Sequence, residues 1–382
     1  MTMHTSESRI AWIALTLTPG LGPKRILNAA QTMGDMSHLF KLSLTDLEAL
    51  NFPAPSAQFV FSGQARIEAE RELTKAHAAG GAILTYEDEA YPDQLRENFD
   101  PPTVLWTLGD VKLLSKPGIA VVGTRHPTPY GTGMAELLSR DLATRRLVIL
   151  SGMARGIDTA AHRGALSAKG ATVAIWGTGT DVIYPKENKA LAENIIASGG
   201  AIISEYRLGT FPAPQNFPKR NRILSGISIG VLVVEAGENS GTRVTARCAL
   251  EQDRDVFAVP GNVTNKNAWG PNTLIKQGAK LVATWEDVWQ ELPTQTRLQL
   301  EGELGFASPE QQVASIVGEL PLQEPEKIVL SALRHDEVVQ LDELMEKLEP
   351  RLTSSEIFTA LFELELANQI KQLPGKNYVR RM

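Results

Sequence analysis

The sequence predicts an α/β protein built on a mainly parallel β-sheet, and three observations support this fold class. Between residues 118 and 261, six short apolar runs, such as IAVV, LVIL and TVAIW, alternate with segments long enough to form a helix. The runs are apolar throughout, which is typical of strands that crossover helices bury on both faces. Each run ends in a loop rich in glycines, hydroxyls or cations. Because ligands bind at the carboxyl ends of the strands in such sheets, we expect a binding site along one sheet edge.

Length and composition narrow the class of protein. A chain of 382 residues with 43% hydrophobic and 21% charged residues is typical of a globular protein of two or three domains. The net charge of −6 argues against a surface that is basic overall but permits a local basic groove. A single cysteine suits a reducing cytoplasm, and the six scattered histidines predict no metal site. No apolar run reaches the length of a membrane span, so we expect a cytoplasmic protein without metal or cofactor.

The first 75 residues are expected to form a helical domain. A Pro-Gly-Leu-Gly turn at residues 19–22 is followed by Lys24 and Arg25, which resembles a helix-hairpin-helix or SAM-like domain. In a helix-hairpin-helix, backbone N–H groups at the glycine turn can bind one phosphate. A small helical bundle, in which the glycines only permit a sharp turn, explains the pattern equally well. The α/β domain is expected over residues 76–295, with an additional strand pair before residue 115 extending the sheet at one edge.

The remainder of the chain predicts a linker and a winged helix. Residues 296–325 are rich in Gln, Glu and Pro and read as a linker. Three short amphipathic helices and a terminal hairpin over residues 326–382 are typical of a winged helix. Its tail, KQLPGKNYVRR, carries four cations and no acid. Its third helix carries Glu356, Glu363 and Glu365, a poor composition for the major groove. We therefore expect this domain mainly to contact protein, with duplex binding as the alternative.

The loop after the first core strand contains Gly123, Thr124 and Arg125. Glycine lets the backbone approach a ligand closely, and Thr124 can donate to an anion. Arg125 offers a planar pair of donors that fits phosphate. A structural salt bridge is the alternative role for Arg125. Its position at the carboxyl end of a strand favours phosphate binding.

The loop after the second core strand begins with Ser151 and Gly152 and leads into a helix near Asp158. Its glycines stand four residues apart and no ribose-binding acid follows the next strand, so it is not a dinucleotide-binding fingerprint. Asp158 and His162 are spaced i, i+4 and would share one helix face. Because neither has further candidate partners for catalysis or metal binding, structural hydrogen bonds are the favoured interpretation.

A cation cluster precedes the fifth core strand. It consists of Lys219, Arg220 and Arg222, and the polar Asn221 lies between them. On a helix Lys219 and Arg222 would share a face, whereas Arg220 would point elsewhere. A solvated charge cluster is the alternative to phosphate binding. No acid lies between Glu205 and Glu235, however, so the cluster is expected to lack local partners.

A further phosphate-binding element is predicted after that strand. Ser240, Gly241 and Thr242 lead into a helix. Backbone N–H groups and hydroxyls at a helix N-terminus form a good cradle for an oxyanion.

Taken together, the motifs resemble those of the DNA-processing protein A (DprA/Smf) family over nearly the whole chain. They are GTRHPTPYG, SGMARGIDTAAHRGAL, GTGTDVIYPKEN, ISEY, FPKRNRILSGIS, EAGENSGTRVTA and VPG followed by GPNTLIKQGA. The resemblance implies an extended Rossmann-like domain that binds single-stranded DNA without cofactor or catalysis. It also implies a homodimer that loads the recombinase RecA onto incoming DNA during natural transformation. Arg125 and the cations Lys219, Arg220 and Arg222 would contact DNA. Arg243 departs from the pattern, since an apolar residue is expected there.

Two other classes of function remain open. The loop GENSGT is similar to the PGGxGT loop of lysine-decarboxylase-like nucleotide phosphoribohydrolases, but the downstream Glu expected in those enzymes is absent. A scaffold whose loops serve only as dimer contacts is the second alternative. The sequence shows no aromatic ladder for stacking bases. Recognition of DNA is therefore expected to rest mainly on backbone electrostatics.

Overall fold

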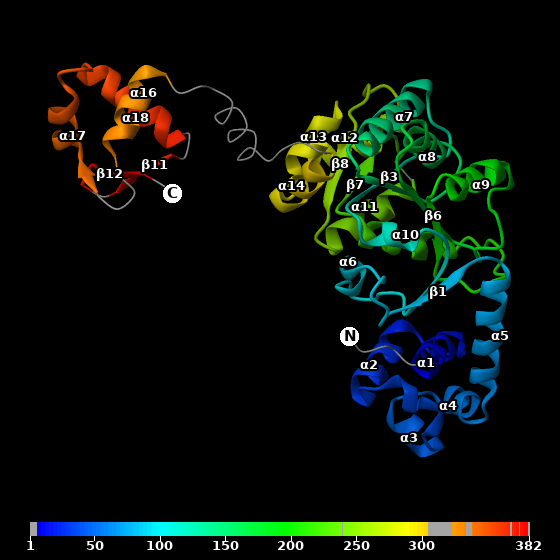
Figure 1. Cartoon of the computed structure of the whole chain (residues 1–382). Coiled ribbons are helices and arrows are strands. Elements are labelled where there is room, and N and C mark those ends of the chain that lie inside the picture. The colour runs from blue at the N-terminus through cyan, green and yellow to red at the C-terminus, as the bar shows by residue number, and fades with distance from the viewer. Residues whose placement is uncertain are drawn as a thin grey trace. The chain divides into compact units, whose positions relative to one another are not determined.

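The computed structural model describes residues 6–238, 240–304, 323–333, 338–366, 369–373 and 375–380. The chain forms two units, Met1–Leu300 and Glu301–Met382. The first contains a nine-stranded sheet and the helices around it, and the described part of the second contains a small three-stranded sheet and the helices packed with it (Figure 1). Among the described residues, no helix combines the length and the hydropathy needed to cross a membrane.

The large sheet reverses its strand order at one point. Its strands are β1 (Ala82–Thr85), β2 (Val104–Gly109), β3 (Gly118–Val122), β4 (Val148–Ser151), β5 (Thr172–Trp176), β6 (Ala201–Ser204), β7 (Gly230–Val233), β8 (Asp255–Ala258) and β9 (Lys280–Leu281). Their order is β1-β2-β6-β5-β4-β3-β7-β8-β9. From β6 to β9 neighbouring strands are parallel, whereas β2 pairs antiparallel with both β6 and β1. The chain proceeds outward from β3 to β6 and then returns to place β7 beside β3. The parallel strands confirm the predicted α/β class, and β1 and β2 form the predicted extension at one edge.

Helices cover both faces of this sheet, which explains the uninterrupted apolar runs. The helices and 3-10 turns of this part are α6 (Asp93–Arg96), η2 (Val111–Ser115), α7 (Pro129–Thr144), α8 (Ile157–Ser167), η3 (Lys186–Asn188), α9 (Lys189–Ala197), α10 (Asn216–Ile227), α11 (Thr242–Glu251), η4 (Lys266–Ala268), α12 (Trp269–Lys276) and α13 (Trp285–Glu291). In β3, Ala120 and Val122 pack in the core with α10 and α11. Ile119 and Val121 pack in the other core with α7 and α8. Burying one such Val or Ile fully is worth about 1.5–3 kcal/mol, so both faces favour apolar side chains.

The N-terminal part is helical, as predicted. It comprises α1 (Ser6–Leu17), α2 (Pro23–Met33), η1 (Met36–Lys41), α3 (Leu44–Ala49), α4 (Ala54–Phe61) and α5 (Gln64–Ala78). These helices share a core with the antiparallel edge strands, in which Trp12 and Trp106 are both buried. The Glu72 carboxylate accepts hydrogen bonds from Trp106 Nε1 at 3.0 Å and from the Leu208 N–H at 2.7 Å. The edge strands therefore join the helical part to the sheet.

The first residues of the predicted linker form a helix instead. Residues 294–303 form α14 (Thr294–Glu303), and Leu300 is buried in the same core as α7 and α8. A single buried leucine among polar residues leaves little helical periodicity to detect in the sequence. Residues 305–322 lie outside the described residues.

The second unit is a winged helix, as predicted. Its helices are α16 (Glu324–Ala332), α17 (Leu341–Leu348) and α18 (Ser354–Leu366), and its sheet has the order β10 (Val339–Gln340), β12 (Asn377–Arg380), β11 (Ile370–Leu373). It has its own core, which includes Leu344, Ile357 and Leu364. The helix α18 leaves Phe358 and Phe362 50% and 64% exposed. Pro374 of the predicted hairpin turn and Arg381 of the basic tail lie outside the described residues.

Candidate nucleic-acid interface

A cleft of about 760 Å³ lies at the carboxyl ends of β3 and β7, where the strand order of the sheet reverses. Its lining comes from the loops that follow strands β3 to β8, from α10, and from the N-termini of α8 and α11. Carboxyl ends of strands at such a reversal form ligand-binding crevices in open α/β sheets. The cleft therefore occupies the position that the sequence predicts for a binding site.

The loop after β3 is held rigidly against β7 by Glu235. The Thr124 N–H donates to the Glu235 carbonyl oxygen at 2.6 Å, and the Glu235 carboxylate accepts from the Thr128 N–H at 2.9 Å and the Thr128 hydroxyl at 2.6 Å. Thr124 Oγ1 accepts from the His126 N–H at 3.2 Å. A Cβ at Gly123 would lie 2.5 Å from Ile157 Cγ1, so glycine is required here for packing. These N–H groups hold the loop in shape rather than pointing freely at a ligand.

Arg125 is the exposed cation on the cleft wall. Its guanidinium lies over the Phe217 ring, 5.7 Å from the centroid. Phe217 in turn packs on Tyr184, with ring centroids 5.4 Å apart and Tyr184 37% exposed. Within the described ranges no carboxylate forms an ion pair with Arg125, so the structural salt bridge finds no support. The polar edge of the guanidinium is available to an anion.

Sequence reasoning missed the two aromatic residues beside Arg125. Tyr184 and Phe217 are separated by more than thirty positions, and Tyr184 lies in a loop whereas Phe217 lies in the first turn of α10. Neither belongs to a periodic pattern. Only the folded structure brings their rings into contact in the lining of the cleft.

The cation cluster on α10 does not act as one group. Lys219 is exposed, whereas Arg220 is buried and donates from Nη1 to the Gly152 carbonyl at 2.9 Å and to the Ile175 carbonyl. A Cβ at Gly152 would lie 2.5 Å from Arg220 Nη2, so Gly152 makes room for this guanidinium. Burial lowers the pKa of Arg220, while nearby Asp158 opposes that shift. Arg220 thus forms the floor of the cleft. Its Nε also donates a hydrogen bond to Asn221 Oδ1 at 3.2 Å.

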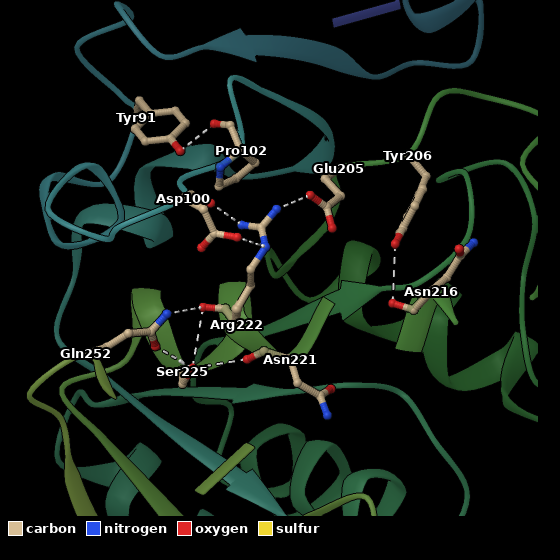
Figure 2. A network of polar contacts seen from close by, with 10 residues as sticks. All are labelled: Tyr91, Asp100, Pro102, Glu205, Tyr206, Asn216, Asn221, Arg222, Ser225 and Gln252. Atoms are coloured by element: carbon tan, nitrogen blue, oxygen red, sulfur yellow. Dashed lines mark hydrogen bonds and ion pairs between the residues drawn. The ribbon is translucent and has the colours of Figure 1, made fainter. Parts of the chain in front are cut away.

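Arg222 has partners that are distant in the sequence, as Figure 2 shows. Its Nη2 donates to Glu205, its Nη1 donates to the Asp100 carbonyl at 2.7 Å, and its Nε lies 3.3 Å from the Asp100 carboxylate. The Arg222 side chain is only 16% exposed. Burial raises the pKa of Glu205, and Arg222 is the main opposing influence. No local acid lies beside the cluster, yet Arg222 is paired, because Asp100 and Glu205 reach it from separate loops.

The residues after β4 support the floor of the cleft. The buried Ser151 hydroxyl donates to the Val121 carbonyl at 2.7 Å. The Asp158 carboxylate accepts from the N–H groups of Gly152 at 3.1 Å and Ala154 at 3.2 Å. Burial raises the pKa of Asp158 to about 6, although Arg220 opposes that shift. Asp158 therefore stabilises the turn that accommodates Arg220.

His162 is fully buried and has a structural hydrogen bond, as predicted, although its partner is Thr172 rather than Asp158. Its Nδ1 lies 2.7 Å from Thr172 Oγ1, whose own proton goes to the Ile149 carbonyl. Nδ1 must therefore be the donor. The other ring nitrogen, Nε2, is buried without a hydrogen-bond partner. Burial lowers the pKa of His162 to about 3.

The N-terminus of α11 borders the opposite side of the cleft. Ser240 Oγ accepts from the Thr242 N–H at 3.2 Å and donates to the Thr242 hydroxyl at 2.9 Å. A Cβ at Gly241 would meet no atom within 4 Å, so this position is open. Of the predicted site residues, the cleft brings together Gly123, Thr124, Arg125, Arg220, Asn221, Ser240, Gly241 and Thr242. Ser151, Gly152, Lys219 and Arg222 lie outside its lining.

A mainly parallel sheet with an arginine-bearing cleft at its reversal point defines this chain as a Rossmann-like α/β protein. The family model of DNA recombination-mediator protein A matches residues 82–293, and the DprA winged helix domain matches residues 317–376. The chain belongs to this DprA/Smf family.

Relatives and a solved structure extend the match beyond the sheet. Protein Smf of Escherichia coli is 42% identical over 299 residues, which cover 78% of this chain and 77% of the relative. DNA processing protein DprA of Bacillus subtilis is 43% identical over 224 residues, covering 58% of this chain and 75% of the relative. The X-ray structure of DprA from Streptococcus pneumoniae is similar with a TM-score of 0.65 and 34% identity, covering 76% of this chain and 99% of that one.

Proposed function

We propose that the cleft binds single-stranded DNA through its phosphates, with little base preference. The observation that carries this proposal is the state of Arg125. It is exposed on the cleft wall, stacked on an aromatic ring, and uncommitted to any carboxylate in the described part of the chain. A planar arginine fork on an aromatic surface suits both the phosphate and the base of an unpaired strand.

The opposite wall supports the same ligand. The N-terminus of α11, with Ser240 and Thr242, carries the positive end of a helix dipole. Lys219 adds an exposed cation on α10 beyond the cleft lining. A local concentration of positive charge in a chain of net charge −6 favours a narrow polyanion in the cleft over a duplex wrapped on the surface.

The acids at the cleft argue against catalysis. Glu235 is buried and its two carboxylate oxygens accept hydrogen bonds from Thr128. Asp158 is engaged by two backbone N–H groups. Neither is placed as a free general base. We therefore infer a binding protein rather than a phosphoribohydrolase. Release of free base from nucleoside monophosphates, at a rate that Glu235→Gln abolishes, would instead establish the enzyme.

Family membership supports a further step, the delivery of bound DNA to the recombinase RecA during natural transformation. We propose that the chain acts in the cytoplasm as a homodimer and loads RecA onto the strand it holds. Light scattering would report the oligomeric state. Faster RecA filament formation on single-stranded DNA in the presence of the protein would report loading.

A salt titration of single-strand binding tests the central proposal. If about three phosphates are neutralised, log Kobs should fall against log salt concentration with a slope near −2, at about −0.7 per phosphate. Fluorescence anisotropy with a labelled oligothymidylate gives this slope directly. A slope near zero, or no binding, would favour the scaffold whose loops serve only as dimer contacts.

A further inference from the structure

Arg243, the residue at which this chain departs from the family pattern, lies at the rim of the cleft. It follows Thr242, which lines the cleft, in the first turn of α11. Its guanidinium lies 5.3 Å from the centroid of the Trp269 ring, and its Nη1 donates to the Glu238 carbonyl at 3.0 Å. No carboxylate pairs with Arg243 within the residues that the structure describes. Most of its N–H donors are therefore uncommitted.

Trp269 differs from the core tryptophans of the chain. It is 38% exposed, whereas Trp12, Trp106 and Trp176 are at most 2% exposed. It begins α12, two positions after Asn267, which lines the cleft. Asn267 Nδ2 donates to the His126 carbonyl at 2.9 Å, which ties this loop to the one that carries Arg125. The start of α12, which carries the indole, is thus held beside the cleft.

The pair has the chemistry of a nucleotide site. Proteins that bind single strands combine cations that contact the backbone with aromatic rings on which bases stack. Arg243 supplies charged donors for a phosphate, and the exposed part of the Trp269 indole supplies an apolar face for a base. We propose that Arg243 and Trp269 bind one further nucleotide where a single strand leaves the cleft over the N-terminus of α11. This inference rests on the proposed function and adds to it a base-stacking contact that backbone electrostatics does not include.

The phosphate half of the proposal is tested with Arg243→Leu and Arg243→Lys on the full chain. Anisotropy with a long oligothymidylate should show about tenfold weaker binding for Arg243→Leu, the lower end of the range for a charge-assisted hydrogen bond. For this variant the slope of log Kobs against log salt concentration should be less steep than for wild type by about 0.7, the value for one phosphate. Arg243→Lys should keep the wild-type slope, because it keeps the charge.

The base half is tested with Trp269→Ala and Trp269→Phe. Loss of stacking on one base should weaken binding of Trp269→Ala by about fivefold or more, with the salt slope unchanged. An oligonucleotide of abasic sites should bind wild type and Trp269→Ala equally. Wild-type tryptophan fluorescence should be quenched on binding normal DNA, and Trp269→Phe should lose most of this quenching while retaining affinity.

Arg125→Ala separates failure of this inference from failure of the proposed function. If Arg125→Ala weakens binding while the Arg243→Leu and Trp269→Ala variants bind like wild type, the strand does not pass over this rim and the inference is wrong. If wild type shows no salt-dependent binding of single strands, the proposed function is wrong, and the inference that rests on it is wrong as well. Thermal unfolding monitored by circular dichroism must show that each variant is folded.

Discussion

The guanidinium of Arg125 lies over the Phe217 ring at 5.7 Å, which joins the loop after β3 to the start of α10 across the cleft. The stacking holds the flat face of the arginine without using its N–H groups. An arginine held in this way loses little further side-chain freedom when a phosphate binds. It is therefore the residue at which the proposed function is most directly tested.

Arg125→Ala should weaken single-strand binding by about 10- to 150-fold, since a hydrogen bond to a charged group is worth roughly 1.5–3 kcal/mol. Lys219→Ala should have a smaller effect because Lys219 lies outside the cleft lining. Anisotropy titrations at one salt concentration measure both. The melting temperature of Arg125→Ala should match wild type. A melting temperature that drops sharply while the folded fraction binds normally would assign Arg125 a structural role.

Arg222→Ala should primarily destabilise the fold. It would leave Glu205, which is mostly buried, and the Asp100 carboxylate without their cation (Figure 2). Removing one partner of a buried ion pair costs about 3–5 kcal/mol, and the lower end applies because Asp100 is about half exposed. Urea unfolding should show this loss. In the double variant Arg222→Met with Glu205→Gln much of the stability should return. If Arg222→Ala is as stable as wild type but binds DNA poorly, Arg222 is a DNA contact.

His162 should make the fold sensitive to acid. Its folded pKa of about 3 lies below the ordinary value, so the unfolded chain binds more protons between roughly pH 6.5 and 3. The stability it contributes is present above pH 6.5 and is lost as the pH falls through this window. Asp158, whose pKa in the fold is raised to about 6, has the opposite effect, because its contribution to stability increases as the pH falls from about 6 to 4.

The variant His162→Gln isolates the histidine, because both proteins retain Asp158. Between pH 7 and pH 4 the free energy of unfolding of wild type should fall by about 3 kcal/mol relative to that of His162→Gln. This is the value for a group that the fold keeps neutral across the 2.5 pH units below its pKa in the unfolded chain. Urea unfolding at a series of pH values measures the difference. Parallel pH profiles for the two proteins would mean that His162 is readily protonated in the fold.

Removing residues from 305 onward should leave the first unit folded and still bound to single strands. The winged helix has its own core, and the described residues that line the cleft all belong to the first unit. We expect single-strand affinity to change by less than about tenfold, or 1.4 kcal/mol. Duplex affinity should fall more, because Lys371, Lys376 and Arg380 are lost with the hairpin. The same oligonucleotide, single- and double-stranded, is titrated against both proteins. Loss of single-strand binding with an unchanged melting transition would place the site in the winged helix.

Local sequence patterns were enough to predict the strands, the loops at their carboxyl ends and the winged helix. The six apolar runs became β3 to β8 because each must be apolar on both sides to lie between two helical layers. The loops at their carboxyl ends could be assigned to one edge because parallel strands must end there together. The winged helix was equally predictable, because amphipathic periods and a hairpin turn are local signals.

Which cations are available for binding depends instead on contacts between segments that are distant in the sequence. Lys219, Arg220 and Arg222 are neighbours in the sequence, yet one is exposed, one is buried under Gly152 and one is paired with Glu205. Arg243 and Trp269, which no sequence pattern links, form a contact at the rim. The physical reason is that hydrophobic periodicity repeats within one segment and can be recognised there. The partner of a charge or an aromatic ring instead lies on another segment, at a distance that the packing of the whole sheet sets.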